Sequence, residues 1–154
     1  MKTIKIGFST SHALFSSLIR LFSSSRVSHT YIRMPLHSSC SELVFQASGL
    51  KVNIEGYKHF ESHSTVVKEI ELQVSDEKYE ELEVFMCDSL GKPYSIKQIF
   101  GMVWVLTCRS VGCKVKNPFR DGDHSYVCVE LVAKILNIPN AEDMTPQDLL
   151  DVLS

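Results

Sequence analysis

The fold is best indicated by residues 126–136, which are Tyr126-Val127-Cys128-Val129-Glu130-Leu131-Val132-Ala133-Lys134-Ile135-Leu136. This largely apolar run predicts a helix over 126–137, with Cys128 in its first turn if Ser125 is the cap. Unpaired backbone N–H groups and the positive end of the helix dipole favour a thiolate at that position. A thiol with a lowered pKa is what a nucleophilic cysteine requires. A small buried core cysteine is the alternative interpretation.

A histidine far upstream is the second informative feature. The run Val27-Ser28-His29-Thr30-Tyr31-Ile32 resembles a β-strand and carries His29 near its start. A histidine in that position is usually structural. However, a cysteine and a distant histidine are the minimum pair for nucleophilic attack on an amide or ester carbonyl. We therefore treat Cys128 and His29 as a candidate catalytic pair.

Length and composition favour one globular domain over residues 1–154. The chain is 44% apolar, has a net charge of −2 and has an isoelectric point near 6.3. A chain of this length can bury a substantial core without disulfides or metals. Its lysines and arginines are scattered, so no basic face predicts nucleic-acid binding. The sequence does not indicate an oligomeric state.

The cysteines favour a reducing compartment. Their number is odd and their spacing irregular, which argues against a disulfide framework. They are Cys40, Cys87, Cys108, Cys113 and Cys128. The Cys108–Cys113 pair could supply half a zinc site, but no matching second pair follows. His59 and His63 have the i, i+4 spacing of metal ligands on a helix. Because residues 60–64 do not resemble a helix, we assign His59 and His63 no chemistry and predict no metal site.

The N-terminal segment permits two interpretations. Residues 11–26 are rich in serine, contain arginine and lack acids, as mitochondrial transit peptides do. The alternative, which we favour, is a short strand followed by an amphipathic helix. No apolar segment is long enough to span a membrane, so stable membrane insertion is not expected. We expect a cytoplasmic protein, although a phage-encoded or lysis-released enzyme would look the same.

The order of elements predicts an α+β fold, because strands dominate the first half of the chain and helices the second. Ser75, Ser95 and Thr145 each precede a predicted helix and are expected to cap it. Residues 107–124 are expected to form a long loop beside the site. The predicted strands are 3–9, 28–34, 42–48, 50–55 and 65–73, and the predicted helices are 12–23, 76–90, 96–106, 126–137 and 146–153.

The order of several short motifs resembles the circularly permuted branch of the NlpC-type, papain-like cysteine hydrolases. In that branch the histidine strand precedes the nucleophile helix. The resemblance covers almost the whole chain, and the order and spacing of the motifs are more specific than any single motif. The motifs are Ile6-Gly7-Phe8-Ser9-Thr10 followed by Ser28-His29, Leu43-Val44-Phe45-Gln46-Ala47, Gly91-Lys92-Pro93-Tyr94-Ser95, Cys128-Val129-Glu130-Leu131-Val132, and Met144-Thr145-Pro146-Gln147-Asp148-Leu149.

The resemblance implies a papain-like fold, in which an antiparallel sheet packs against helices and the nucleophile lies at a helix N-terminus. It also implies a role for each matching residue. Cys128 would be the nucleophile, His29 the general base, and Gln46 the residue that orients the imidazole. Tyr94 would place a hydroxyl near the oxyanion. The implied substrate is a peptide or another acyl amide, such as a cell-wall peptide, and the chemistry needs no metal or organic cofactor.

Two departures from the family pattern leave alternatives open. Gln46 replaces the commoner acid or histidine, and a neutral amide cannot stabilise an imidazolium as a carboxylate does. Val129 replaces the usual serine and could narrow the pocket. One alternative is a lipid-directed acyltransferase or phospholipase of the same fold, with residues 102–106 lining an apolar channel. The other is a non-catalytic binding protein that retains the fold.

Overall fold

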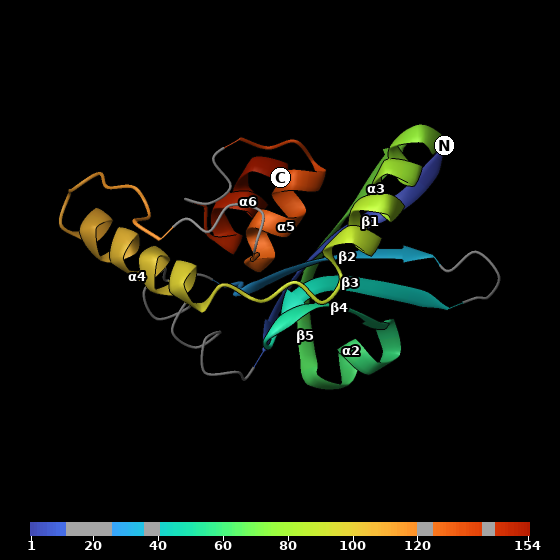
Figure 1. The fold of residues 1–154 in the computed structure, drawn as a ribbon, viewed down its shortest axis with the longest axis horizontal. Helices are drawn as coiled ribbons and strands as arrows, with labels where there is room; N and C mark the ends of the chain where they lie inside the picture. Colours follow the sequence, from blue (N-terminus) through green and yellow to red (C-terminus); the bar gives the residue numbers. More distant parts are fainter. Residues whose placement is uncertain (12–25, 36–40, 120–124, 140–143) are drawn as a thin grey trace.

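The computed structural model describes residues 1–11, 26–35, 41–119, 125–139 and 144–154. An antiparallel sheet packs against helices, which confirms the α+β class (Figure 1). The strands are β1 (Lys2–Ser11), β2 (His29–Pro35), β3 (Glu42–Ser48), β4 (Lys51–Gly56) and β5 (Ser64–Val74). The helices are α2 (Tyr57–His63), α3 (Asp76–Ser89), α4 (Ile96–Ser110), α5 (Cys128–Ile135) and α6 (Pro146–Leu153).

The sheet has five strands in the order β4-β3-β2-β1-β5. Every neighbouring pair is antiparallel. β3 and β4 form a hairpin in which Ser48 pairs with Lys51, so Gly49 and Leu50 make the turn. Gly49 has a φ of 64°, a conformation that glycine adopts without steric cost. The register of this hairpin determines which polar side chains meet beside His29.

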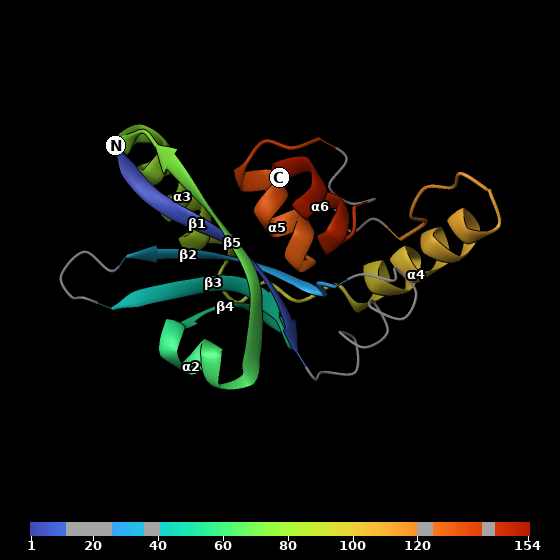
Figure 2. The same ribbon diagram turned by 180° about the vertical axis from the view of Figure 1, so that it is seen from behind.

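The two faces of the sheet are covered by different helices. The larger cluster joins the sheet to α3, α5 and α6. Its buried strand residues are Ile4, Ile6, Phe8, Ile32, Met34, Phe45, Ala47 and Val52. On the other face Tyr31 and Val44 pack with Phe60 of α2. Figures 1 and 2 show α2 on the side of the sheet opposite α5 and α6, whereas α4 projects away from the sheet.

Helix caps follow the predicted chemistry. The hydroxyl of Ser75 accepts a hydrogen bond from the backbone N–H of Lys78, and Thr145 forms a capping box with Asp148. Ser95 likewise accepts from the N–H of Gln98. These bonds satisfy backbone donors that the first turn of a helix leaves unpaired. The predicted starts of α3, α4 and α6 are therefore confirmed.

Three predictions about helices were wrong. Residues 57–63 form α2, although this stretch was not expected to be helical. The predicted loop over 107–124 begins later, because α4 continues to Ser110. Helix α5 was predicted to begin at residue 126, but it begins at Cys128, with Val127 instead of Ser125 as its N-cap. The predicted helix 12–23 lies outside the described residues.

Candidate active site

Cys128 is the first residue of α5 and is 3% exposed. Tyr126, two residues before Cys128, is hydrogen-bonded to the segment 93–95. The N–H of Tyr126 donates to the carbonyl of Pro93 at 3.1 Å, and the N–H of Ser95 donates to the carbonyl of Tyr126, also at 3.1 Å. These bonds hold Tyr126 outside the helix, and Val127 is also extended, so the helix begins at Cys128. The thiol therefore lies at the N-terminus of a helix, where the dipole favours its anion.

His29 is the first residue of β2, where it pairs with Ser9 of β1. Its ring makes two side-chain contacts, one with Cys128 and the other, a hydrogen bond, with Gln46. The second joins His29 Nε2 to Gln46 Oε1 at 2.6 Å. Because Nε2 is used by Gln46, Nδ1 is the ring nitrogen left for the thiol. The structure thus brings together three of the four predicted site residues through one imidazole.

Glu55 of β4 determines how Gln46 is oriented. The amide nitrogen of Gln46 donates to Glu55 Oε1. A carboxylate can only accept hydrogen bonds, so the amide nitrogen must face Glu55 and the amide oxygen must face His29. The oxygen in turn requires a proton on His29 Nε2. The neutral imidazole therefore presents an unprotonated Nδ1 to Cys128, which is the tautomer that a general base needs.

The pKa of the Cys128 thiol is lowered. Burial by itself raises this pKa, but the hydrogen bond and positive charge of His29, together with the backbone N–H of Thr30, outweigh it. All of these groups stabilise the thiolate and not the thiol. A cysteine with a lowered pKa next to a histidine is a nucleophile in chemical terms.

The pKa of His29 is raised above 6.5. Burial lowers this pKa, but the hydrogen bond and charge of Cys128, the hydrogen bond that His29 donates to Gln46 and the negative charge of Glu55 together outweigh it. Glu55 thus contributes a charge that favours the imidazolium, which the Gln46 amide alone cannot supply. The departure from an acid at position 46 is compensated by an acid directly behind it.

Tyr94 lies beside the thiol because two backbone contacts fix its segment. Its N–H donates to the carbonyl of Leu50 at 2.9 Å, and the residue forms a parallel bridge with Tyr126. Burial, the charge of Cys128 and a hydrogen bond to Cys128 raise the pKa of Tyr94 well above 10. The phenol therefore stays protonated and can donate a hydrogen bond toward the sulfur or toward an oxyanion formed beside it.

The two neighbours of Cys128 singled out in the sequence are buried. Val129 is fully buried in the larger core cluster. Glu130 is also buried, and its carboxylate lies 3.8 Å from the ammonium of Lys134. A carboxylate in the first turn suits the helix dipole, as predicted. The apolar run 102–106 belongs to α4, where Met102 and Val105 are buried.

Several other residues from the sequence analysis carry no assigned chemistry. Cys87, Cys108 and Cys113 are free thiols. Cys40 lies outside the described residues.

Glu55 is a residue of the candidate site that the sequence did not reveal. Asn53 lies directly opposite Gln46 in the hairpin, and Glu55 is two residues further along the same strand. Alternate residues of a strand share a face, so Glu55 is the diagonal neighbour of Gln46. The two-residue turn at Gly49-Leu50 could have indicated this register from the sequence.

No protein-family model matches this chain, and a search of curated proteins found no relative. Within the described residues, no helix combines the length and apolar character needed to cross a membrane.

Proposed function

We propose that this protein is a cysteine hydrolase that cleaves an amide bond through a covalent acyl-enzyme. The single observation that carries the proposal is the hydrogen-bonded chain His29–Gln46–Glu55 beside Cys128, whose thiol has a pKa that His29 helps to lower. A buried cysteine with only a structural role has no need of a hydrogen-bonded imidazole, an orienting amide and a carboxylate behind it.

The chemistry follows from the positions of these groups. The Cys128 thiolate attacks the carbonyl carbon, and the C=O electrons move to oxygen to form a tetrahedral oxyanion. The phenol of Tyr94 and the backbone N–H of Cys128 are the donors placed to stabilise it. The imidazolium of His29 then protonates the leaving amine as the C–N bond breaks. Water, deprotonated by His29, hydrolyses the thioester and regenerates the thiol.

The papain-like type, in its permuted NlpC form, belongs to this proposal. The histidine strand precedes the nucleophile helix in the chain, and Cys128 begins a helix that packs against β2 and β3. A cell-wall peptide or another peptide amide is the substrate class that the resemblance favours.

The acyl-enzyme can be tested with p-nitrophenyl acetate, whose activated ester reports acylation without knowledge of the natural substrate. The proposal predicts a burst of one p-nitrophenolate per chain and an acetyl group on Cys128 in the intact-protein and peptide mass spectra. Cys128→Ala should abolish the burst and retain the far-UV circular dichroism of the wild type. An undiminished burst in Cys128→Ala, or acetylation confined to the other cysteines, would refute the proposal.

A lipid-directed acyl transfer is the second candidate, because α4 exposes two aromatic side chains. Phe100 is 58% and Trp104 is 55% exposed, and their i, i+4 spacing places them on one side of the helix. Exposed aromatic residues on a projecting helix are suited to contact with a lipid surface. Cleavage of long-chain acyl esters in preference to peptide amides, together with loss of that preference in Trp104→Ala, would select this candidate.

A further inference from the structure

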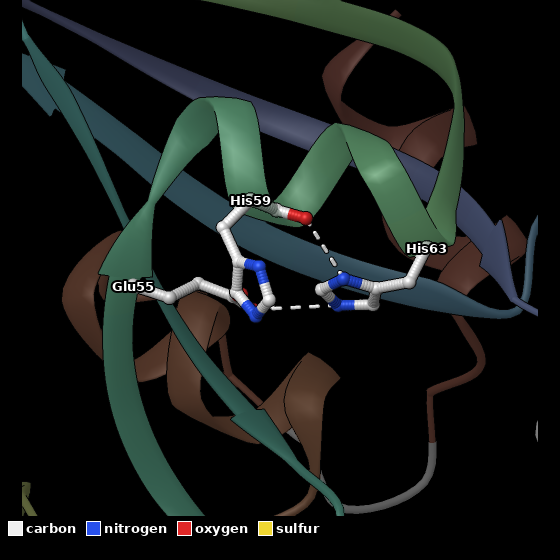
Figure 3. A group of neighbouring side chains, drawn as sticks. All are labelled: Glu55, His59 and His63. Atoms are coloured by element: carbon white, nitrogen blue, oxygen red, sulfur yellow. Dashed lines mark hydrogen bonds and ion pairs between the residues drawn. The ribbon is translucent and has the colours of Figure 1, made fainter.

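A cluster of two histidines and a glutamate lies behind the hydrogen-bonded chain, on the α2 side of the sheet. Figure 3 shows His59 and His63 on α2 directed toward Glu55 at the end of β4. His59 Nε2 lies 3.6 Å from Glu55 Oε2, and His63 Nε2 lies 3.6 Å from Glu55 Oε1. The potential ligand atoms of these three residues all lie within 4.8 Å of one another. From this arrangement we propose a binding site for a divalent transition-metal ion of the zinc type.

The spacing of the ligand atoms fits such an ion. Zinc binds nitrogen and carboxylate oxygen at about 2.0–2.2 Å, so two ligand atoms of a tetrahedral site lie about 3.4 Å apart. The two Nε2–carboxylate distances of 3.6 Å are close to this edge length. Three protein ligands would leave a fourth position for water. Imidazole nitrogen favours zinc, copper or nickel over magnesium and calcium, which prefer oxygen ligands.

Hydrogen bonds already orient two of the three potential ligands, His63 and Glu55. His63 Nδ1 lies 2.9 Å from the carbonyl oxygen of His59, to which it can only donate, so Nε2 is left as an unprotonated donor for a metal. Glu55 is held by the amide nitrogen of Gln46. Metal-binding histidines usually donate their second nitrogen to a carbonyl or carboxylate, and ligating carboxylates are themselves hydrogen-bonded.

The site is open to solvent on one side and connected to the candidate active site on the other. The side chains of His59 and His63 are 75% and 48% exposed, whereas that of Glu55 is 17% exposed. An ion can therefore enter without rearrangement of the core. Once bound to the carboxylate of Glu55, it would fix the group that accepts the hydrogen bond of Gln46. The metal site does not depend on the proposed hydrolase function and can be tested without an activity assay.

The test is an isothermal titration of the full chain with zinc chloride. A Cys108→Ser/Cys113→Ser background keeps these thiols from competing for the ion. We expect one zinc per chain, and a loss of affinity of at least tenfold in each of His59→Ala, His63→Ala and Glu55→Gln. Glu61→Gln removes a carboxylate from the same helix outside the cluster and should leave the affinity unchanged. Zinc at a hundredfold excess over its Kd should also raise the Tm by about 5 to 10 °C.

Two results would overturn this proposal. One is the absence of stoichiometric binding at millimolar zinc. The other is binding whose affinity and Tm shift are the same in His59→Ala and His63→Ala as in the parent protein. Because both side chains are largely exposed, these two variants should fold, and their circular dichroism spectra provide the check.

Discussion

Gln46 should be essential for reactivity although it never touches the substrate. It is 2% exposed and accepts from His29 Nε2 at 2.6 Å while donating to Glu55. Gln46→Leu keeps a side chain of similar bulk but removes both hydrogen bonds. His29 then loses the acceptor that selects its tautomer, and Glu55 loses the amide donor that holds its carboxylate.

The size of the effect can be bounded from these contacts. A buried polar group left without its partner costs about 1–3 kcal/mol, so the substitution should lower stability by an amount in that range. A correctly positioned general base contributes about 10²- to 10⁴-fold to a rate. We therefore expect the rate of acylation of Cys128 by p-nitrophenyl acetate to fall by about 10²-fold or more. The pH profile of acylation should also shift, because the hydrogen bond with Gln46 that raises the pKa of His29 is lost.

Asn53→Leu is the matched control. Asn53 lies opposite Gln46 in the hairpin and donates to the hydroxyl of Ser48 at 3.2 Å. This variant should lose some stability but keep the wild-type acylation rate and pH profile. Equal losses of rate in Gln46→Leu and Asn53→Leu, with unaltered pH profiles, would mean that Gln46 is only a packing residue.

Three further predictions concern the oxyanion, the thiol and the sheet. Tyr94→Phe should slow acylation by about 10²-fold, measured as the burst rate, because one donor to the oxyanion is lost. The alkylation rate of Cys128 should rise with pH through a pKa below that of an ordinary cysteine and then level off, because burial raises the thiol pKa less than His29 and Thr30 together lower it. A profile identical to that of an ordinary exposed thiol would contradict this. Gly7→Ala should destabilise the protein by about 1–3 kcal/mol in denaturant titrations, since its Cβ would lie 2.0 Å from the ring of Tyr31, whereas Gly56→Ala meets no atom within 4 Å and should cost less.

The strands could be predicted from the sequence because each carries a local signal. β3 occupies residues 42–48 as predicted, since apolar residues and a turn at Gly49 delimit it. α2 was missed for a physical reason. It has seven residues, a glycine N-cap without a side-chain hydrogen bond and a single buried residue, Phe60. Such a helix is stabilised by its packing under β3, β4 and β5 and not by its own sequence.

The exact position of Cys128 in its helix also depended on tertiary contacts. The apolar run favours a helix from residue 126, but the hydrogen bonds between Tyr126 and the 93–95 segment hold that residue in an extended form. Finding Glu55 required the hairpin register, for which the turn at Gly49-Leu50 is the signal in the sequence. The candidate pair Cys128 and His29 could therefore be named from the sequence. The carboxylate of Glu55 behind Gln46, and the candidate metal site that it forms with His59 and His63, could be recognised only in the folded chain.

The central claim is that His29 activates Cys128, and labelling with iodoacetamide at pH 6 tests it most directly. Cys87 and Cys113 are exposed and Cys128 is buried, so exposure alone predicts that the first two react faster. Activation predicts the reverse order, because a thiol with an ordinary pKa near 8.5 is almost fully protonated at this pH. We expect peptide mass spectra to show preferential alkylation of Cys128 in the wild type and loss of that preference in His29→Ala. Faster alkylation of Cys87 and Cys113 than of Cys128 in the wild type, unchanged by His29→Ala, would contradict the account.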